Sequence, residues 1–509
     1  MKYNINWASN QLFFLAPDTI LKKIIQKAIN LINVHPEILI NIEKDQDVLA
    51  KKKKKIRIAD KNYYDNKKPS LFTSLTNIEA VEIKEKELEL KVGRKRMYPI
   101  VVYIFMIIRG YFISVTDKES IERILDSYTL NLALESLGSK MPGSTTILEN
   151  INAVSEQTRK LIFDAQIEHI LNEGFDDFDK CQIDSTSIKA NSEWPTDSGI
   201  ALKLLKRSLH YLKNLETFGL PSYQIWYSEK WLSKLKKVNF KINNVSGKAN
   251  SKGKIKTYYR QFLNNAQKLH DYLITEKERI EECYIDQAPS VQQKLDIIWE
   301  KIDNDLMVIA KVLYYTENRI FHGIVLKSSA KILSISDCTA AYINKGNRIP
   351  LIGYKPQIAR STNGFVTSII VPQGNANDSK LFIPVLKDVI NRTTVIPKVV
   401  SVDDGYSSAK GFKSAFKMGV KTVSIGGAKG KKLTPEFEWG SNEYKQARND
   451  RSAVESTIFT LKYIFEFGKL RRREINNIRA ELLEKVIVFN FYRMIFIEQN
   501  ERNKCNGKF

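Results

Sequence analysis

The fold is decided by residues 399–406, which read VVSVDDGY. Three of the first four residues are valines, a composition typical of a short buried strand. Asp403 and Asp404 follow directly, so a carboxylate is expected at the C-terminal end of this strand. A carboxylate at the edge of a core is costly unless a partner neutralises it, and a divalent cation would do so.

Three segments before this strand also have strand character. They are residues 331–337, 352–359 and 364–371, and the last two can pair as a hairpin through residues 361–364. Residues 377–379 then cap a helix. Its apolar face consists of Leu381, Phe382, Val385, Leu386 and Val389. A hairpin, a crossover helix and a buried strand predict an α/β fold.

Two further acids lie where apolar elements end or turn. Asp184 falls in residues 178–190, which alternate and are β-branched in their second half, so a strand is predicted. Glu455 lies beside an apolar stripe on a helical stretch predicted over 442–500. The stripe is Val454, Ile458, Leu461 and Phe465.

Cysteine and histidine do not indicate a metal site of their own. The four cysteines and five histidines are scattered, without a C-x-x-C pair, so neither a disulfide framework nor a Cys or His cluster is indicated. Metal chemistry would therefore use carboxylates, whose hard oxygens suit Mg²⁺ or Mn²⁺.

Two cations accompany Glu455. Arg451 precedes it by four residues and Lys462 follows it by seven, spacings that place all three on one helix face. An acid flanked by two cations suits a phosphodiester, because the acid can hold metal and the cations can hold phosphate oxygens. The alternative is a surface ladder of salt bridges.

The overall charge is strongly basic. The 509 residues contain 80 Lys and Arg against 57 Asp and Glu, a net charge of +23. This excess favours a polyanion partner, either nucleic acid or an acidic membrane surface. The alternative is the Lys-rich composition common to chains from AT-rich genomes. The longest apolar stretch, residues 98–108, is too short to cross a bilayer, so a soluble cytoplasmic protein is expected.

Residues 192–325 return to a helical pattern and contain the densest positive charge. The window 230–260 has ten Lys and Arg and no acid, with Trp231, Phe240, Tyr258 and Tyr259 interleaved. The cations are Lys230, Lys234, Lys236, Lys237, Lys241, Lys248, Lys252, Lys254, Lys256 and Arg260. Such a window predicts nucleic-acid binding, with aromatic rings available for base stacking. The alternative is a solvated helical pair whose aromatics face the core.

The N-terminal third is predicted to be helical. Residues 1–95 contain an apolar helix and a basic run at 51–57, either solvated or a tether on DNA. In residues 96–175, capping boxes at 116–119 and 146–149 flank a Gly- and Pro-containing break at 138–143. This arrangement is compatible with a DNA-reading module, although any helical bundle has such joints.

Several smaller features have plainer interpretations. Asp197 and Asp378 are predicted to cap helices, and Asp337 to have a structural role. Residues 426–432 read GGAKGKK and predict a flexible basic loop, with phosphate binding as the alternative. Arg471, Arg472 and Arg473 either clamp DNA or favour a helix C-terminus.

Taken together, these segments resemble the DDE-type bacterial insertion-sequence transposases, closest to the subgroup called ISNCY-like. The matching pieces are DST at 184–186, WPTDS at 194–198, GYK at 353–355, GNAND at 374–378, DDGY at 403–406 and the helix from Arg451 through Glu455 to Lys462. Their order and spacing are more specific than any one of them. The pattern often has a tyrosine three residues before the arginine, whereas this chain has Arg448 there and Tyr444 one turn earlier.

The resemblance implies a fold and a domain order. It implies an RNase H-like mixed sheet with flanking helices over residues 177–500, interrupted by the basic helical insertion 192–325. A helical DNA-binding domain would cover 96–176, after the N-terminal region 1–95, and residues 501–509 would be a tail.

The resemblance also implies a site. Asp184, Asp403 and Glu455 would be the catalytic and metal-binding acids for Mg²⁺ or Mn²⁺, as two ions, with Asp404 the second choice for the middle position. Arg451, Lys462, Arg448, the lysines at 234, 236, 237, 252, 254 and 256, and Arg471–Arg473 would contact DNA.

The implied activity is cleavage at the element's ends and 3′-hydroxyl strand transfer into target DNA. The implied partners are the terminal inverted repeats, the target duplex and a second copy of the chain, and the implied location is the bacterial nucleoid. Two alternatives remain: an RNase H-like nuclease or resolvase without strand transfer, and a non-enzymatic DNA-binding protein.

Overall fold

The computed structural model describes residues 20–67, 97–111, 118–119, 121–122, 143–191, 196–221, 225–283, 287–324, 326–327, 331–337, 339–344 and 349–505. Contacts divide the chain into two compact units. The first comprises residues 1–47, 97–193 and 336–509, and the second comprises residues 48–96 and 194–335. The α/β class predicted from the sequence is confirmed, with a mixed sheet and extensive helical regions.

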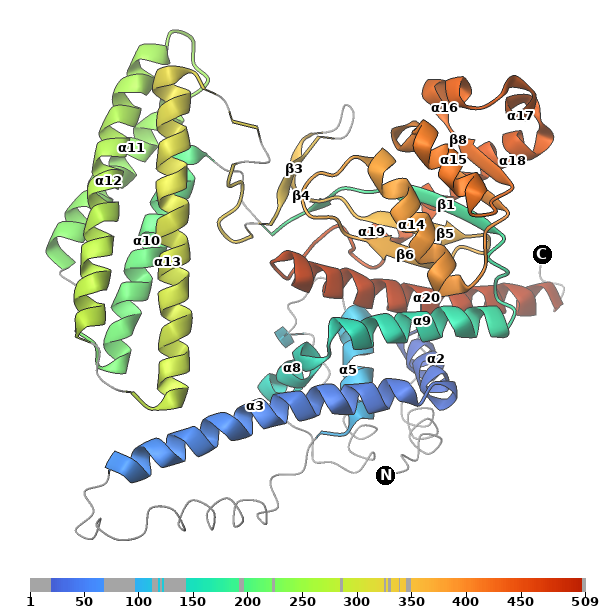
Figure 1. Cartoon of the computed structure of the whole chain (residues 1–509), viewed down its shortest axis with the longest axis horizontal. Coiled ribbons are helices and arrows are strands. Elements are labelled where there is room, and N and C mark those ends of the chain that lie inside the picture. The colour runs from blue at the N-terminus through green and yellow to red at the C-terminus, as the bar shows by residue number, and fades with distance from the viewer. Residues whose placement is uncertain are drawn as a thin grey trace. The chain divides into compact units, whose positions relative to one another are not determined.

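A five-stranded mixed sheet lies at the centre of the first unit (Figure 1). Its strands are β1 (Lys180–Ser185), β5 (Gln357–Ser361), β6 (Val366–Ile370), β7 (Val399–Val402) and β8 (Thr422–Ile425), in the order β6-β5-β1-β7-β8. The β6, β5 and β1 strands pair antiparallel, and β7 and β8 continue from β1 in parallel. A second sheet has the order β2-β4-β3, from β2 (Ile188–Lys189), β4 (Leu351–Tyr354) and β3 (Ala341–Ile343).

The strand predictions are confirmed for β1, β7 and the β5–β6 hairpin and are wrong in two places. Residues 352–359 form two strands in different sheets, broken at Lys355 and Pro356. Residues 331–337 form no strand, because Ile332 and Ile335 pack against the helical core of the second unit. The neighbouring strand is β3 instead.

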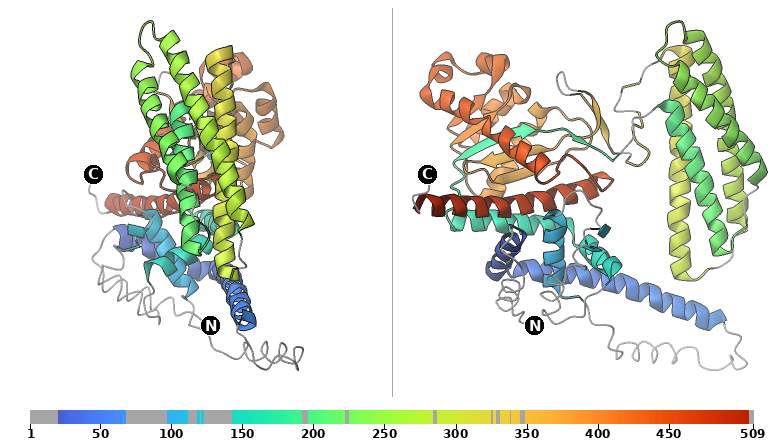
Figure 2. Two further views of the ribbon diagram at one scale, coloured as in Figure 1. Left: turned by 90° about the vertical axis from the view of Figure 1, so that its left-hand side faces the viewer. Right: turned by 180° about the vertical axis from the view of Figure 1, so that it is seen from behind.

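Helices cover both faces of the central sheet. Alternate residues such as Ile183 and Val402 face α14 (Asp378–Thr393) and α15 (Ala409–Lys417) in one apolar core. The opposite face packs against α18 (Asn442–Asp450) and α19 (Ala453–Tyr463). In Figure 1 α14 lies in front of the sheet, and the view from behind in Figure 2 shows the orange-red helices of the other face.

The helical stretch predicted over 442–500 is interrupted twice. Arg451 ends α18, and a turn separates it from α19, so Arg451 and Glu455 do not share one continuous helix. Residues 464–474 are irregular before α20 (Ile475–Cys505) begins, and buried Phe465 lies beyond α19. Periodicity alone missed the second break because apolar residues within it, such as Phe465, are also buried.

Helices of the N-terminal third pack against α20, namely α2 (Ile20–Val34), α5 (Pro99–Tyr111) and α9 (Glu156–Asn172). The next helix, α8 (Ser144–Ala153), packs against α5, and Gln46 on α3 (Glu37–Lys67) donates to Asn150 on α8. α9 and α20 run side by side in Figure 1. The capping box at 146–149 is wrong, since α8 begins at Ser144 after Gly143. The box at 116–119 and the break at 138–142 fall largely outside the described residues.

In the described part of residues 194–335, the long helices α10 (Asp197–Leu215), α11 (Ile225–Val245), α12 (Lys252–Glu282) and α13 (Pro289–Glu317) surround one apolar core. Thr196 caps α10 through its side chain, so the predicted cap at Asp197 is wrong by one residue, and Asp197 pairs with Arg319. The lysines of the run at 51–55 lie exposed on α3. Nowhere in the described parts of the chain is a helix both long and apolar enough to span a membrane.

Candidate active site

Asp184 and Asp403 lie side by side at the carboxyl edge of the central sheet. β1 and β7 are parallel neighbours, and Ile183 is the register partner of Val402. The next residues along the two strands are Asp184 and Asp403. Neighbouring strands are about 4.8 Å apart, so the register places the two backbones within carboxylate-bridging reach. Asp184 is only 8% exposed.

The hydroxyl of Tyr406 lies close to both aspartates. Burial raises its pKa well above the usual value, and the carboxylates of Asp378, Asp184 and Asp403 raise it further. Tyr406 donates its hydroxyl hydrogen to Oε1 of Gln357. This tyrosine therefore stays protonated and keeps the acidic turn attached to the core beneath it.

Asp378 is not a helix cap. It is buried, and its Oδ2 accepts from Nζ of Lys355 at 2.7 Å and from Oγ of Ser185 at 3.3 Å. Its Oδ1 accepts from Nε2 of Gln357 at 3.0 Å. A Cβ added to Gly405 would lie 3.1 Å from Oδ1 of Asp403 and 3.3 Å from Oδ2 of Asp378, so the two acids flank this glycine. Lys355 thus places a buried positive charge beside the acids.

Asp403 and Asp404 have different surroundings. Oδ1 of Asp404 accepts from the backbone amides of Lys429 and Gly430, at 2.9 and 3.2 Å. These amides belong to α16 (Gly427–Leu433), so the predicted flexible loop at 426–432 is wrong and a short helix is present instead. Asp403 accepts from the amide of Gly405, at 2.9 Å, within its own turn.

Glu455 lies on α19, over the same sheet face as Asp184. Arg360 on β5 links this face to the helix, since it donates to Gln182 on β1 and to Oγ1 of Thr457. The Glu455 side chain is 57% exposed, and Oε1 lies 3.2 Å from a guanidinium nitrogen of Arg451.

The two predicted companions of Glu455 mark the sheet edge. A Cβ added to Gly426 would lie 3.6 Å from the carbonyl oxygen of Val402 and 3.8 Å from Nε of Arg451, so Arg451 lies beside the end of β7. Lys462 donates from Nζ to the carbonyl oxygen of Ser187, at 3.1 Å, just after β1. Residues on both sides of Glu455 along the chain thus lie near the C-terminal ends of β7 and β1.

The structure does not gather the three predicted acids around one point. Within the described residues, no three His, Cys, Asp or Glu side chains are grouped so that they could hold a metal ion. The aspartates are adjacent through strand register, whereas Glu455 is turned to Arg451.

Some predicted DNA contacts are occupied within the fold. Arg472 donates to Oε2 of buried Glu484 at 2.9 Å, and Arg471 lies 3.8 Å from Glu466, while Arg473 is exposed. The guanidinium of Arg448 stacks over Trp439, with its carbon 5.0 Å from the ring centroid.

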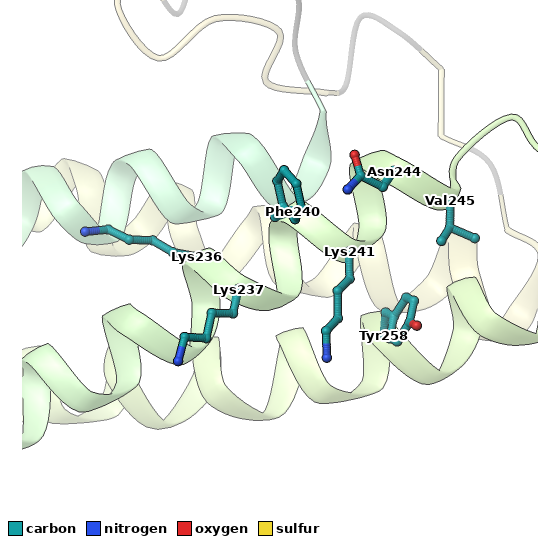
Figure 3. Close-up of a pocket in the computed structure, with 7 residues that line it drawn as sticks. All are labelled: Lys236, Lys237, Phe240, Lys241, Asn244, Val245 and Tyr258. Carbon is teal, nitrogen blue, oxygen red and sulfur yellow. The ribbon is translucent and has the colours of Figure 1, made fainter.

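The basic window of the second unit lies on α11 and α12. Its residues line a hollow of about 580 Å³ between the two helices (Figure 3). Lys237 and Lys241 extend from α11 toward α12, and Nζ of Lys241 lies 5.8 Å from the ring centroid of Tyr258. The aromatic side chains support different interpretations. Phe240 is 67% exposed and is available for stacking on bases, whereas Tyr259 is buried in the core.

The sequence interpretation missed the roles of Lys355, Gln357 and Tyr406. All three are buried polar residues next to strand ends. The signal available was a lysine followed by proline between two apolar segments, which is an unusual place for a charge to be buried.

The chain is therefore an α/β protein whose mixed sheet carries two carboxylates at the ends of neighbouring strands. Residues 340–491 match the family model described as the transposase DDE domain. The resemblance to DDE-type insertion-sequence transposases is thereby confirmed for this part of the chain, which is similar to a transposase DDE domain. The matched segment includes Asp403 and Glu455 and begins after Asp184. No curated protein and no solved structure gives a significant match.

Proposed function

We propose that this chain is the transposase of an insertion sequence, which cleaves phosphodiesters at the element's ends and transfers the freed 3′-hydroxyl into target DNA. The observation that carries the proposal is the register of β1 and β7, which makes Asp184 and Asp403 neighbours. The sheet order, with three antiparallel strands followed by two parallel ones, supports an RNase H-like core.

The donor set fits a divalent cation. Asp184, Asp403 and Glu455 supply only carboxylate oxygens, which Mg²⁺ and Mn²⁺ prefer. When bound, a pair of such ions would lower the pKa of a water or hydroxyl nucleophile and stabilise the leaving oxygen. Asp404 is the weaker candidate, because the amides of α16 already use its Oδ1.

The chain's own residues would position the DNA. The Asp403 turn is held by Tyr406 through Gln357 and by the fold around Asp378, so the carboxylates are fixed before substrate binds. Arg451 and Lys462 stand at the same edge and would neutralise phosphate oxygens as Arg451 releases Glu455. The domain order follows as proposed above: DNA-binding helices over 96–176, catalytic residues over 177–500 and a basic insertion over 192–325.

The lysines of α11 and α12 are proposed as a DNA-holding surface. Their hollow combines Lys236, Lys237 and Lys241 with one exposed ring, Phe240. Double-stranded DNA is the proposed substrate, bound by two copies of the chain in the cytoplasm.

The test is cleavage of labelled DNA that carries the sequences flanking this gene. Wild-type protein with Mg²⁺ is expected to cut at the ends and to join them to a plasmid. Asp403→Asn is expected to lower the cleavage rate at least 100-fold, since it removes a metal ligand. Asp404→Asn is the matched control and is expected to retain most of the rate.

The outcomes separate the alternatives. Equal cleavage by wild type and Asp403→Asn would refute the site. Loss of cleavage in Asp404→Asn, with cleavage retained in Asp403→Asn, would make Asp404 the metal ligand in place of Asp403. Cleavage without joining would make the protein a nuclease or resolvase, and binding without cleavage would make it a DNA-binding protein.

A further inference from the structure

An exposed aromatic pair continues the Glu455 face of α19. Phe459 follows Glu455 by four residues and Tyr463 by eight, spacings that keep all three on one side of a helix. Phe459 is 61% exposed and Tyr463 is 69% exposed. The two ring centroids are 4.3 Å apart with an interplanar angle of 36°. The rings therefore contact each other more than the core.

The placement of these rings is unusual for side chains of their size. α19 has a separate apolar face, where Val454, Ile458 and Leu461 are buried against the sheet. Phe459 and Tyr463 do not contribute to that face, so burial in the fold does not explain them. Exposed rings grouped on one helix face mark an interaction surface.

Cations surround the second half of α19. Lys462 lies between the two rings in sequence and reaches the carbonyl oxygen of Ser187. Two residues beyond Ser187, Lys189 forms a backbone bridge with Lys469, and both lysines are exposed. Aromatic rings among lysines complement a single-stranded nucleic acid, since rings stack on bases and cations neutralise phosphates.

The distances along the helix match a few nucleotides. A helix rises about 1.5 Å per residue, so Phe459 lies roughly 6 Å and Tyr463 roughly 12 Å along the axis from Glu455. One nucleotide step is about 3.4 Å along a strand. If Glu455 acts at the scissile phosphate, the rings therefore lie about two to four nucleotides away.

We propose that Phe459 and Tyr463 form a base-stacking platform for unpaired nucleotides next to the cleavage point. This inference rests on the proposed function, because Glu455 locates the cleavage point. The platform takes up bases released from pairing when the end of the duplex opens, and it is tolerant of sequence because every base has a π face. Phe459 and Tyr463 are thus substrate-binding residues in addition to the acids and cations already named.

The test compares two DNA probes of arbitrary sequence in EDTA, so that binding is read without cleavage. One is a blunt duplex, and the other has a four-nucleotide 3′ single-stranded extension containing 2-aminopurine. Wild-type protein is expected to bind the extended probe on the order of 10-fold more tightly and to change its 2-aminopurine fluorescence, as stacking requires.

The variants decide the assignment. Phe459→Ala with Tyr463→Ala is expected to remove both the preference and the fluorescence change, and Phe459→Tyr with Tyr463→Phe to keep both. Phe437→Ala is the control, since Phe437 is also exposed, at 78%, but lies on α17 (Glu436–Gly440). Circular dichroism of the double alanine variant should match wild type, because neither ring supports the core.

Two results would overturn the platform. The first is an unchanged preference for the extended probe in the double alanine variant. The second is a change of oligomeric state: the wild-type protein is a dimer without DNA, and the double alanine variant is a monomer that keeps the preference for the extended probe. The rings would then join two copies of the chain. Asp403→Asn is assayed in parallel for cleavage with Mg²⁺. Loss of cleavage in this variant supports the proposed function. Cleavage by this variant at the rate of the wild-type protein refutes that function without affecting the stacking result.

Discussion

At the scale of single residues, the acidic edge depends on how its charges are compensated. Asp184, Asp378 and Asp403 all raise the pKa of Tyr406, so the charges of three carboxylates act on this one buried side chain. Lys355 is a buried cation among them and lies 2.7 Å from Asp378. Its ammonium group therefore keeps the edge folded before any metal or DNA neutralises it.

Removing Lys355 should be more damaging than removing its partner. Lys355→Met leaves three acids without this cation, and we expect it to lower the free energy of unfolding by about 3–5 kcal/mol, as for other broken buried pairs. Asp378→Asn removes one of the crowded negative charges, which offsets part of the loss. Urea unfolding of both variants measures the difference, and equal losses would contradict this order.

At the scale of elements, a buried ion cluster joins four parts of the first unit. Glu484 on α20 accepts from Arg109 on α5 at 2.6 Å, from Arg159 on α9 at 2.9 Å and from Arg472 before α20 at 2.9 Å. Burial by itself raises the pKa of Glu484, but the charges of the three arginines outweigh it and hold the pKa well below the usual value. The cluster thus connects helices far apart in sequence.

Glu484→Gln should destabilise this helical layer. It leaves three buried guanidinium groups without their shared anion, so we expect a loss of about 3–5 kcal/mol in urea unfolding. Glu156→Gln breaks an exposed pair with Lys160 and is the matched control, with an expected change of about 0–1 kcal/mol. Similar values for both variants would show that the cluster adds no stability.

The same cluster predicts an acid limit to stability. Because the folded pKa of Glu484 is depressed, its contribution is full above the unfolded pKa of about 4.3 and is lost as pH falls through the folded pKa. Wild-type unfolding free energy should therefore drop below about pH 4. Glu484→Gln should show a shallower drop over the same range, and parallel curves would contradict this.

At the scale of the whole molecule, charge is distributed between two kinds of surface. The net charge is +23, and ten cations lie in one acid-free window on α11 and α12. The acids of the sheet edge lie in the other unit, where buried Lys355 compensates them. We therefore expect DNA affinity to depend steeply on salt.

Changing Lys236, Lys237 and Lys241 to Gln together should flatten that dependence. Each lost phosphate contact lowers the slope of log K against log salt by about 0.9, so the slope should fall by up to roughly 3. Changing Lys410, Lys413 and Lys417 on α15 to Gln removes the same charge elsewhere. Fluorescence anisotropy with duplex DNA at several salt concentrations compares the two, and equal slopes would contradict a DNA-holding role for the α11–α12 hollow.

Local sequence patterns were sufficient to predict the elements that carry the site. The valines of 399–402 and the alternation before Asp184 specify strands, and the apolar stripe beside Glu455 specifies a helix, because these patterns depend only on neighbours along the chain. It missed the break at Lys355–Pro356, where both residues are buried between two strands, and the break at Arg451, where two helices follow each other closely along the chain.

Which side chains meet depends on how distant segments pack. The β1–β7 register makes Asp184 and Asp403 neighbours across more than two hundred residues. Asp404 accepts from a backbone amide of α16, and Asp378 accepts from Lys355 instead of capping a helix. These outcomes depend on strand pairing and on the compensation of buried charge between distant segments. Local pattern does not contain that information, because the free energy of a buried carboxylate is set by whichever partner the fold brings to it.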